Sequence, residues 1–367
     1  MITVTKPWLP DRKKLDFYID KIYSSGHITN DGPLLKLLEE RLQKYLGVKN
    51  LILVNNGTTA LQVAYEALEL KGEIITTPFS FIATSSSIVW QGKKAVFADI
   101  SSDTLNIDPN QIIKKINKNT SAIVPVHCFG NPVDVAAVKE ISENHNLKTI
   151  YDASHAFGIK NSDGSSILNS GDVSTLSFHA TKLFHTIEGG AIITSDDELA
   201  QKIRIMIRCG IPGKDSVQYL GTNAKMNEFS AAMGLCILED IETILQRRKR
   251  IWEQYVEGLK GLVIFQLWSS RYENNYAYVP VIFSSSDSLL SAEKALSLEN
   301  ILPRRYFYPS LDTLDFLSTS QVCENSRDIA SRIMCLPIYP GLSEQNVKRT
   351  IDIIRSSILE ERQHSST

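Results

Sequence analysis

Apolar and polar residues follow two different periods along the first two thirds of the chain. In residues 34–46 the apolar positions recur at helical spacing and stop before Gly47, which predicts an amphipathic helix that ends at a glycine. Short unbroken apolar runs such as 51–54 predict buried strands, because a strand covered on both faces needs no polar positions. Strands are predicted at 51–54, 74–75, 95–98, 121–126, 149–152, 173–178 and 190–194, and helices at 13–23, 34–46, 59–70, 81–90, 132–145 and 196–208. This alternation indicates an α/β fold with a mostly parallel sheet covered on both faces.

The pattern changes near residue 227. Residues 227–260 predict one long helix or two, and strand-like runs follow at 262–267 and 276–283. A chain of 367 residues is long enough for about two domains. We therefore expect a large domain over 1–245 and a smaller C-terminal α+β domain over 246–367, with part of the N-terminal lead packing on the smaller one.

Composition and charge exclude several classes of protein. Hydrophobic residues make up 43% of the chain and charged residues 22%, and the net charge is -2, which argues against wholesale binding to nucleic acid or to an anionic membrane. The basic run 247–250 is interpreted as the solvated face of a helix. Five scattered cysteines without CxxC spacing argue against a disulfide framework and against a metal site. The chain shows no apolar signal core and no membrane-length apolar run, so we expect a soluble, cytoplasmic protein.

Three strand ends carry candidate chemistry. After the strand at 51–54 comes Asn55-Asn-Gly-Thr-Thr59, where Gly57 permits a close backbone approach and Thr58 and Thr59 offer hydroxyls at a helix start. Helix starts bind phosphate through their free N–H groups and positive dipole end. The alternative for this segment is an ordinary capped helix start.

Asp152 and Lys182 follow two later strands of the predicted sheet. Asp152 lies at the carboxyl end of the strand at 149–152, the edge where ligands bind in open α/β sheets, although an aspartate there also serves as a helix cap. Lys182 lies between an apolar strand and a Glu-Gly-Gly turn, with Ser177 just before it as a further hydroxyl. Phe81, at the start of a predicted helix, offers an aromatic ring, with core packing as the alternative for it and for Phe79.

These groups together match the needs of pyridoxal 5′-phosphate. A lysine amine forms the Schiff base with this cofactor, an aspartate keeps its ring nitrogen protonated, and a helix start holds its phosphate. Each signal is weak alone, but all of them lie at strand-to-loop junctions of one predicted sheet. The flanking histidines, His179 and His185, are interpreted as packing or polar residues.

Several longer motifs resemble the DegT/DnrJ/EryC1/StrS sugar aminotransferases. The motifs that carry the resemblance are Asn56-Gly-Thr-Thr-Ala-Leu61, Thr77-Pro-Phe-Ser-Phe-Ile-Ala-Thr84, Tyr151-Asp-Ala-Ser-His155, Ser177-Phe-His-Ala-Thr-Lys182, Glu188-Gly-Gly190, Gly221-Thr-Asn-Ala-Lys-Met226 and Leu336-Pro-Ile-Tyr-Pro340. They span nearly the whole chain. The resemblance implies the aspartate aminotransferase type I fold, with a large domain built on a doubly covered mixed sheet and a smaller C-terminal α+β domain. It also implies a homodimer with active sites at the subunit interface.

The resemblance assigns roles to individual residues. It implies that Lys182 forms the Schiff base, that Asp152 pairs with the pyridine nitrogen, that Phe81 stacks on the ring, that His155 lies near the ring hydroxyl, that Thr58, Thr59 and Ser177 hold the phosphate beside Gly57, and that Asn223 reaches the phosphate of the partner subunit. Two positions depart from the family pattern. Lys225 stands where relatives usually carry arginine, and Leu183 stands where many carry asparagine.

The Ser-Phe-His-Ala-Thr-Lys form is most similar to the VioA-type branch, which aminates C4 of dTDP-4-keto-6-deoxyglucose with L-glutamate as the donor. The resemblance thus implies dTDP-4-amino-4,6-dideoxy-D-glucose for a surface polysaccharide such as O-antigen. Arg304, Arg305 and Tyr308 are candidates for binding the nucleotide diphosphate, with a surface arginine pair as the alternative.

Other functions stay open at this point. They are a 3-keto sugar aminotransferase of the same family, a non-enzymatic cofactor-binding regulator and a nucleotide-binding module without this cofactor. A related sugar dehydratase is disfavoured, because such relatives carry histidine in place of the lysine.

Overall fold

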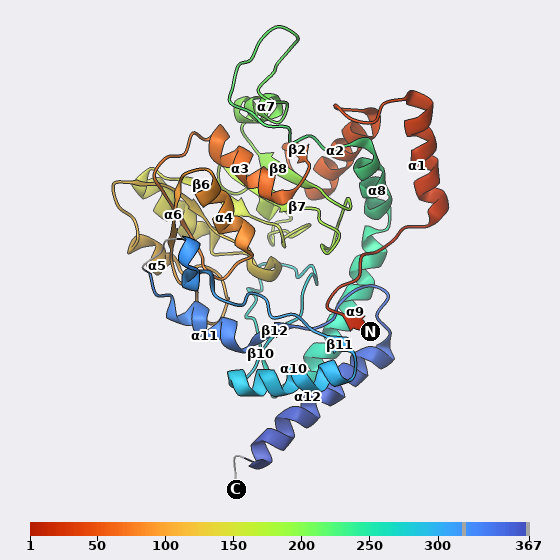
Figure 1. The fold of residues 1–367 in the computed structure, drawn as a ribbon, viewed down its shortest axis with the longest axis vertical. Coiled ribbons are helices and arrows are strands. Elements are labelled where there is room, and N and C mark those ends of the chain that lie inside the picture. Colours follow the sequence, from red (N-terminus) through yellow and green to blue (C-terminus); the bar gives the residue numbers. More distant parts are fainter. Residues whose placement is uncertain (318–320, 365–367) are drawn as a thin grey trace.

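The computed structural model describes residues 1–317 and 321–364, and a seven-stranded mixed sheet lies at its centre (Figure 1). The strands are β2 (Asn50–Val54), β3 (Glu73–Thr76), β4 (Lys94–Phe97), β5 (Thr120–Val124), β6 (Lys148–Asp152), β7 (Val173–Ser177) and β8 (Gly190–Thr194). Their order is β2-β8-β7-β6-β5-β3-β4, and β8 runs antiparallel to both of its neighbours. The remaining pairs are parallel, which confirms the predicted mixed and mostly parallel sheet.

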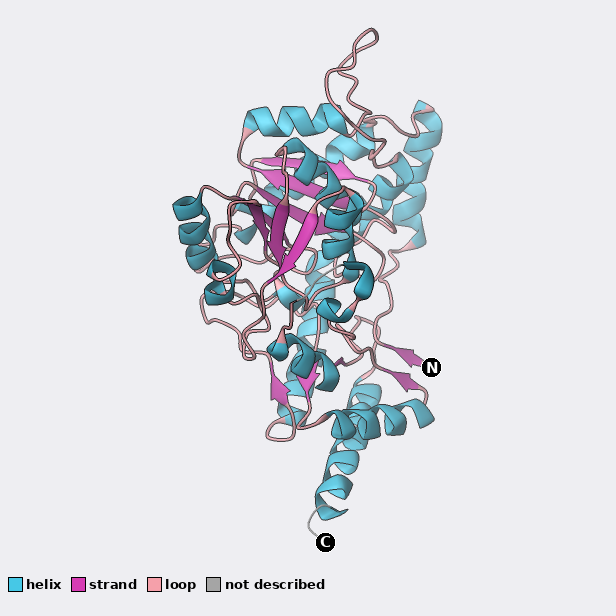
Figure 2. Cartoon of the chain, turned by 60° about the vertical axis from the view of Figure 1, so that its left-hand side comes forward, coloured by secondary structure: helices cyan, strands magenta, loops and turns pink. Residues whose placement is uncertain are grey.

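Both faces of this sheet are buried under helices (Figure 2). On β2, Leu51 and Leu53 join the core under α2 and α8, while Ile52 and Val54 join the core under α3 and α7. Successive side chains of a strand point to opposite faces, so burial on both sides explains the unbroken apolar run. The helices that surround the sheet are α1 (Arg12–Ser25), α2 (Pro33–Leu46), α3 (Gly57–Ala67), α4 (Ile82–Trp90), α5 (Pro109–Ile113), α6 (Val135–His145), α7 (Asp197–Met206) and α8 (Glu228–Glu239).

The C-terminal part is built around α9 (Ile241–Leu259), a small antiparallel sheet of order β12-β10-β9 and three further helices. Its other elements are β9 (Ile264–Phe265), β10 (Pro280–Ile282), β11 (Ile301–Leu302), β12 (Ile333–Cys335), α10 (Ser286–Leu298), α11 (Glu324–Arg332) and α12 (Glu344–His364). The first strand of the chain, β1 (Ile2–Thr3), pairs in parallel with β11. Short 3-10 turns lie at η1 (Cys128–Gly130), η2 (Ile167–Asn169), η3 (Leu311–Thr313) and η4 (Asp315–Leu317).

Helix α9 contributes to two hydrophobic cores. Ile241 and Ile244 pack in the core beneath α2 and α8, whereas Tyr255 and Leu259 pack in the C-terminal core with α10 and α12. The helix therefore passes residue 245 without a break and links the two parts of the molecule. The domain boundary at that residue stays a prediction.

The predicted helical stretch 227–260 consists of two helices that meet at Asp240. The carboxylate of Asp240 accepts hydrogen bonds from the Trp8 indole at 2.9 Å and from the Lys14 amine at 2.5 Å. Asp240, at the break between α8 and α9, therefore holds the N-terminal segment that contains Trp8 and Lys14 against this helix pair.

Two predictions in this part of the chain were wrong in detail. The expected strand 276–283 is limited to β10, because the carbonyls of Tyr276 and Ala277 accept hydrogen bonds from the Arg248 side chain instead of a neighbouring strand. The expected strand 262–267 shortens to the two residues of β9. Arg248 is also buried at 4% exposure, so the basic run 247–250 is not wholly a solvated helix face.

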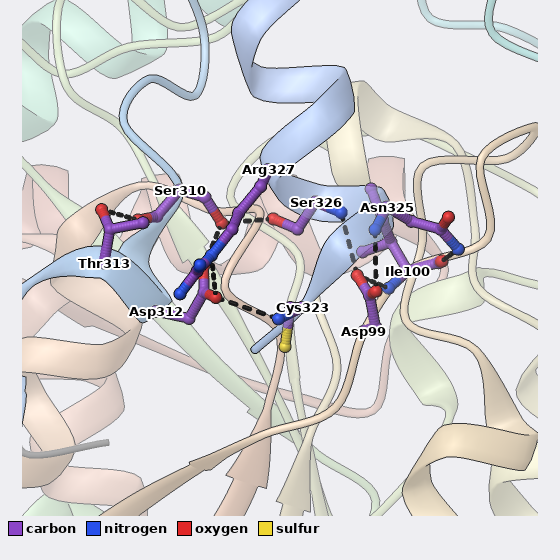
Figure 3. A network of polar contacts seen from close by, with 9 residues as sticks. All are labelled: Asp99, Ile100, Ser310, Asp312, Thr313, Cys323, Asn325, Ser326 and Arg327. Carbon is purple, nitrogen blue, oxygen red and sulfur yellow. Dashed lines mark hydrogen bonds and ion pairs between the residues drawn. The ribbon is translucent and has the colours of Figure 1, made fainter. Parts of the chain in front are cut away.

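A polar network joins α11 to the end of β4 (Figure 3). The carboxylate of Asp99 accepts hydrogen bonds from the backbone N–H groups of Asn325 and Ser326 at 2.9 Å each, at the N-terminus of α11. Asp312 accepts from the Cys323 backbone at 3.0 Å and from the Arg327 guanidinium at 2.7 Å. The Asp99 bonds fasten the C-terminal segment to the edge of the large sheet, and the Asp312 bonds hold that segment together.

Two further properties concern membrane-spanning helices and the state of the cysteines. Over residues 1–317 and 321–364, the structure contains no helix with the length and apolarity that a bilayer crossing requires. All five cysteines are free thiols, and four of them are buried.

Candidate active site

A cavity of about 250 Å³ lies at the carboxyl ends of β6 and β7, against the starts of α3 and α4. Eight of the residues singled out from the sequence line it, namely Gly57, Thr58, Phe81, Asp152, His155, Ser177, Lys182 and Arg304. Parallel strands bring their carboxyl ends to one edge of the sheet, so residues far apart in sequence meet there. Thr59, Asn223, Arg305 and Tyr308 are not part of this cavity wall.

The start of α3 forms one end of the cavity. Asn56 caps the helix, and its side-chain oxygen accepts a hydrogen bond from the Thr59 backbone at 2.8 Å. A Cβ on Gly57 would lie 2.8 Å from the Cβ of Ser177, so only glycine lets α3 approach the end of β7 this closely. The result is a helix N-terminus flanked by the hydroxyls of Thr58 and Ser177, which is a suitable cradle for an anion.

Asp152 lies at the last position of β6 and is buried at 5% exposure. One carboxylate oxygen accepts a hydrogen bond from the Thr84 hydroxyl at 2.7 Å, and the other accepts from the Ser154 backbone at 3.1 Å. The Thr84 hydroxyl is in turn 2.8 Å from that of Ser80. Among the described residues, no cation lies within ion-pair distance of Asp152. The carboxylate is thus oriented by neutral donors and keeps its charge available to a cationic group.

Lys182 lies in the loop between β7 and β8 and faces the same cavity. Its amine donates a hydrogen bond to the Tyr278 hydroxyl at 3.3 Å. Burial lowers the pKa of Lys182 to about 8, with a further lowering from Arg304, while Asp152 acts in the opposite direction. A lysine with such a pKa is partly in its neutral, nucleophilic form near neutral pH.

His155 and Phe81 form two other sides of the cavity. The Nδ1 atom of His155 accepts a hydrogen bond from the Phe129 backbone at 3.2 Å, so the neutral ring carries its proton on Nε2. Burial and the nearby Lys182 hold the pKa of His155 well below its usual range. Phe81 is 50% exposed at the cap of α4, whereas Phe79 is fully buried. Of these two phenylalanines only Phe81 lines the cavity, and its stacking on a cofactor ring stays a prediction.

Some residues of the site escaped the sequence analysis. Thr84 lies inside a recognised motif, but only the fold shows that its hydroxyl donates to Asp152. Tyr278 contacts Lys182 although 96 positions of sequence separate them, and no local sequence pattern predicts a contact between two such residues. His179, interpreted from the sequence as a packing or polar residue, lies 3.5 Å from Glu188 on the cavity wall, and Glu188 was not singled out as a site residue.

The remaining sequence candidates lie elsewhere. The guanidinium of Arg305 donates to the Ser331 carbonyl at 2.9 Å and stacks on the Tyr308 ring at 3.7 Å. Asn223 is exposed, and its side-chain oxygen accepts a hydrogen bond from Lys225 at 2.6 Å. Thr59 contributes its backbone N–H to the helix cap. The substrate-binding roles of Arg305 and Tyr308, the phosphate contact of Thr59 and the cross-subunit contact of Asn223 stay predictions.

Comparison with known proteins identifies close relatives of the whole chain. The model of the DegT/DnrJ/EryC1/StrS aminotransferase family matches residues 11–355. A dTDP-4-amino-4,6-dideoxy-D-glucose transaminase of Shigella dysenteriae is 42% identical over 362 residues, which cover 96% of this chain and 98% of the relative. A transaminase of the same description from Escherichia coli is 37% identical, over 96% of this chain and 98% of its own.

The fold also matches solved structures. The crystal structure of DesI in the presence of its TDP-sugar product superposes with a TM-score of 0.94 at 31% identity, covering 100% of this chain and 95% of that one. The overall fold is therefore shared with a protein whose structure was solved in the presence of its TDP-sugar product.

Proposed function

The chain belongs to the DegT/DnrJ/EryC1/StrS aminotransferase family, and from that premise we propose that it transfers the amino group of L-glutamate to C4 of dTDP-4-keto-6-deoxy-D-glucose. The product is dTDP-4-amino-4,6-dideoxy-D-glucose, the sugar nucleotide that both transaminase relatives carry in their names. The observation that carries the proposal is that the desolvated Lys182 shares one cavity with Asp152, a carboxylate for which the described residues supply no ion-pair partner.

The residues of the cavity fit pyridoxal 5′-phosphate. The N-terminus of α3, with Thr58 and Ser177, would hold the phosphate, because glycine at position 57 lets the helix start lie against Ser177. Asp152 would face the ring nitrogen, and Phe81 would cover one face of the ring. When bound, the cofactor supplies an electron sink that stabilises negative charge on the substrate carbon.

Lys182 is the base of the reaction in this proposal. Its amine would hold the cofactor, and when it is not engaged there it would be free to carry a proton. The lowered pKa of about 8 suits a group that must both take and return a proton near neutral pH. The hydrogen bond to Tyr278 keeps the amine at the cavity wall rather than in solvent.

Arg304 is the proposed contact for an anionic group of the substrate. It lies on the cavity wall, and its guanidinium stacks over the ring of Tyr306 at 4.5 Å. A planar, permanently charged fork matches phosphate or carboxylate oxygens. Arg305 has one of its nitrogens committed to the Ser331 carbonyl, so it is the weaker candidate of the pair.

We further propose a cytoplasmic homodimer that supplies a surface polysaccharide such as O-antigen. Asn223 is exposed and absent from the cavity of its own chain, which supports a contact with the phosphate site of a second copy. Cross-linking or light scattering would report the dimer, and a mixture of inactive Lys182 and Asn223 variants would regain activity if sites are shared.

One incubation tests the activity. The protein is mixed with pyridoxal phosphate, L-glutamate and dTDP-4-keto-6-deoxyglucose, and the product is read by mass and NMR. An equatorial 4-amino sugar supports the proposal, whereas conversion of glutamate without this product moves the search to 3-keto sugars. Absence of any amino transfer would favour a cofactor-binding regulator.

The Lys182→Ala variant gives the sharpest control. We expect a loss of turnover of at least about 10³-fold, because both the covalent hold and the proton carrier disappear. Lys139→Ala, at an exposed lysine of α6, should leave turnover unchanged. A Lys182→Ala protein that still forms product would rule out the assigned role of Lys182.

A further inference from the structure

Arg248 differs from the other basic residues of its run. Arg247 lies over the Trp8 ring at 5.3 Å, and Lys249 and Arg250 are exposed, whereas Arg248 points into the protein at 4% exposure. Burial lowers the pKa of Arg248 to about 10, with the nearby Tyr278 acting in the opposite direction. No carboxylate of the described residues forms an ion pair with it. Burying a cation without a counter-charge lowers the stability of the fold. An apolar side chain of similar size would fill the same space without that loss.

The guanidinium of Arg248 is bound to two successive backbone carbonyls. Its Nε donates to the Tyr276 carbonyl at 3.0 Å, and one terminal nitrogen donates to the Ala277 carbonyl at 2.6 Å. The planar, rigid guanidinium can donate to two adjacent carbonyls in a fixed geometry, whereas the flexible ammonium of a lysine would hold them less firmly. The backbone of Tyr276 has a φ of 55°, a left-handed conformation that an L-residue adopts only when its surroundings hold it.

Asn275 grips the same segment from the opposite side. Its side-chain nitrogen donates to the carbonyls of His155 at 2.9 Å and Phe157 at 3.1 Å, and its oxygen accepts from the Ala277 backbone at 3.2 Å. The segment 275–278 is therefore clamped between α9 and the loop that carries His155. Residues 275–278 lie outside β10, so no neighbouring strand fixes the position of this backbone.

The segment 275–278 ends at Tyr278, which lines the candidate active site. The Tyr278 hydroxyl accepts the hydrogen bond from Lys182 at 3.3 Å, and the centre of its ring lies 4.6 Å from that of His155. Arg248 and Tyr278 also line one small cavity of about 10 Å³ behind the lysine. The position of the clamped backbone thus sets the position of the group that holds the lysine amine.

From this geometry we infer that Arg248 is a positioning residue for Lys182, acting through the segment 275–278 and Tyr278. The inference rests on the proposed catalytic role of Lys182. Displacing a reacting group by about 1 Å costs up to about 10²-fold in rate, so a distant clamp can control the reaction. The basic run 247–250, interpreted from the sequence as a solvated helix face, would then contain a residue, Arg248, that controls the reaction rate.

A double-mutant cycle tests the inference. The rate constant of the single glutamate half-reaction is measured with saturating pyridoxal phosphate in four proteins, namely wild type, Arg248→Met, Tyr278→Phe and the double variant. We expect about a tenfold loss for Arg248→Met and about a 2- to 10-fold loss for Tyr278→Phe, the latter being the loss of one hydrogen bond. If Arg248 acts through Tyr278, its substitution costs clearly less in the Tyr278→Phe background than in the wild type.

The pH profile supplies a readout that a purely structural role would not move. The charged or titratable groups that interact with Lys182 are Asp152, His155, Tyr278 and Arg304, and His179, Glu188 and Tyr306 line the same cavity. Loosening Tyr278 admits water to the amine and weakens the desolvation that holds its pKa down, so the midpoint of apoprotein reaction with pyridoxal phosphate should move to higher pH in Arg248→Met. Arg248→Lys should recover part of the rate, and Arg250→Met, an exposed change on the same helix, should match the wild type.

Two outcomes would overturn the inference. Equal rates and equal pH midpoints for Arg248→Met and wild type, with only the thermal midpoint lowered, would make Arg248 a structural residue. Additive losses in the double variant would mean that Arg248 does not act through Tyr278. A wild-type protein that fails to react with glutamate would instead refute the proposed function, which separates the two failures.

Discussion

Asp152 and Asp312 are two buried aspartates, each 5% exposed, in very different surroundings. Asp312 accepts hydrogen bonds from the Ser310 hydroxyl at 2.5 Å, the Cys323 backbone at 3.0 Å and the Arg327 guanidinium at 2.7 Å. Its charge is thus neutralised by a cation of the same chain (Figure 3). Asp152 receives two neutral donors, and the described residues place no ion-pair partner beside it.

The difference separates a structural carboxylate from a functional one. A buried charge that is fully paired resists change and holds two segments together. A buried charge that is oriented but not neutralised creates a place for a cationic ligand, at a cost in stability that the ligand offsets. The partners of a buried group are therefore more informative about its role than its burial.

The largest expected effect is on the activity of Asp152→Asn. The amide keeps the shape of the side chain but loses the negative charge that is proposed to lie opposite the cofactor ring nitrogen, so kcat should fall by about 10²-fold or more. Thermal unfolding of the apoprotein should be unchanged or slightly raised, since an unpaired buried charge is removed. A kcat within threefold of wild type would contradict the assigned role, and Asp197→Asn on the surface of α7 is the matched control.

Asp312→Ala should show the opposite profile. It removes the acceptor of three hydrogen bonds, so the free energy of unfolding should drop by about 3 kcal/mol. Activity per folded molecule should stay close to wild type, because Asp312 does not line the cavity. Denaturant unfolding measures the first quantity and steady-state kinetics the second. An unchanged unfolding midpoint would show that Asp312 does not stabilise the fold and would contradict its assignment as a structural carboxylate.

Titration of the apoprotein sharpens the picture of the lysine that faces Asp152. The neutral amine of Lys182 is the form that captures pyridoxal phosphate, and its pKa is lowered to about 8. The second-order rate of cofactor uptake should therefore rise about tenfold per pH unit below 8 and level off above it. Stopped-flow absorbance measures this rate. A midpoint near the ordinary lysine value would show that burial does not control this amine.

The smallest expected effect comes from removing single hydroxyls beside each carboxylate. Thr84→Val deletes the donor to Asp152 without changing shape, and it should lower kcat by about tenfold or less. Ser310→Ala deletes a donor to Asp312 and should lower stability by about 1 kcal/mol while kcat stays constant. Equal effects of both changes on kcat would show that the two networks are not functionally distinct.

Much of the fold followed from local pattern. The glycine at the end of α2, the apolar run of β2 and the alternation of strands and helices each have a short-range cause, so they were predictable. The short strand near 281 was not, because hydrogen bonds from Arg248 occupy the carbonyls of Tyr276 and Ala277 just before it. The short strand near 264 was not either, since the Leu267 N–H donates to the Asp103 carbonyl instead of to β10. That residues at strand ends meet in one cavity was likewise predictable, since parallel strands place their carboxyl ends together, whereas their roles stay predictions.

The sequence by itself determined the α/β class, the family resemblance and the set Gly57, Asp152, Ser177 and Lys182, because each depends on contiguous motifs. Only the tertiary structure decided that Thr84 orients Asp152, that Tyr278 holds Lys182 and that Arg248 is buried behind them. The reason is physical. Those contacts join residues tens of positions apart, and their strength comes from burial and exact geometry, neither of which has a signature in local sequence.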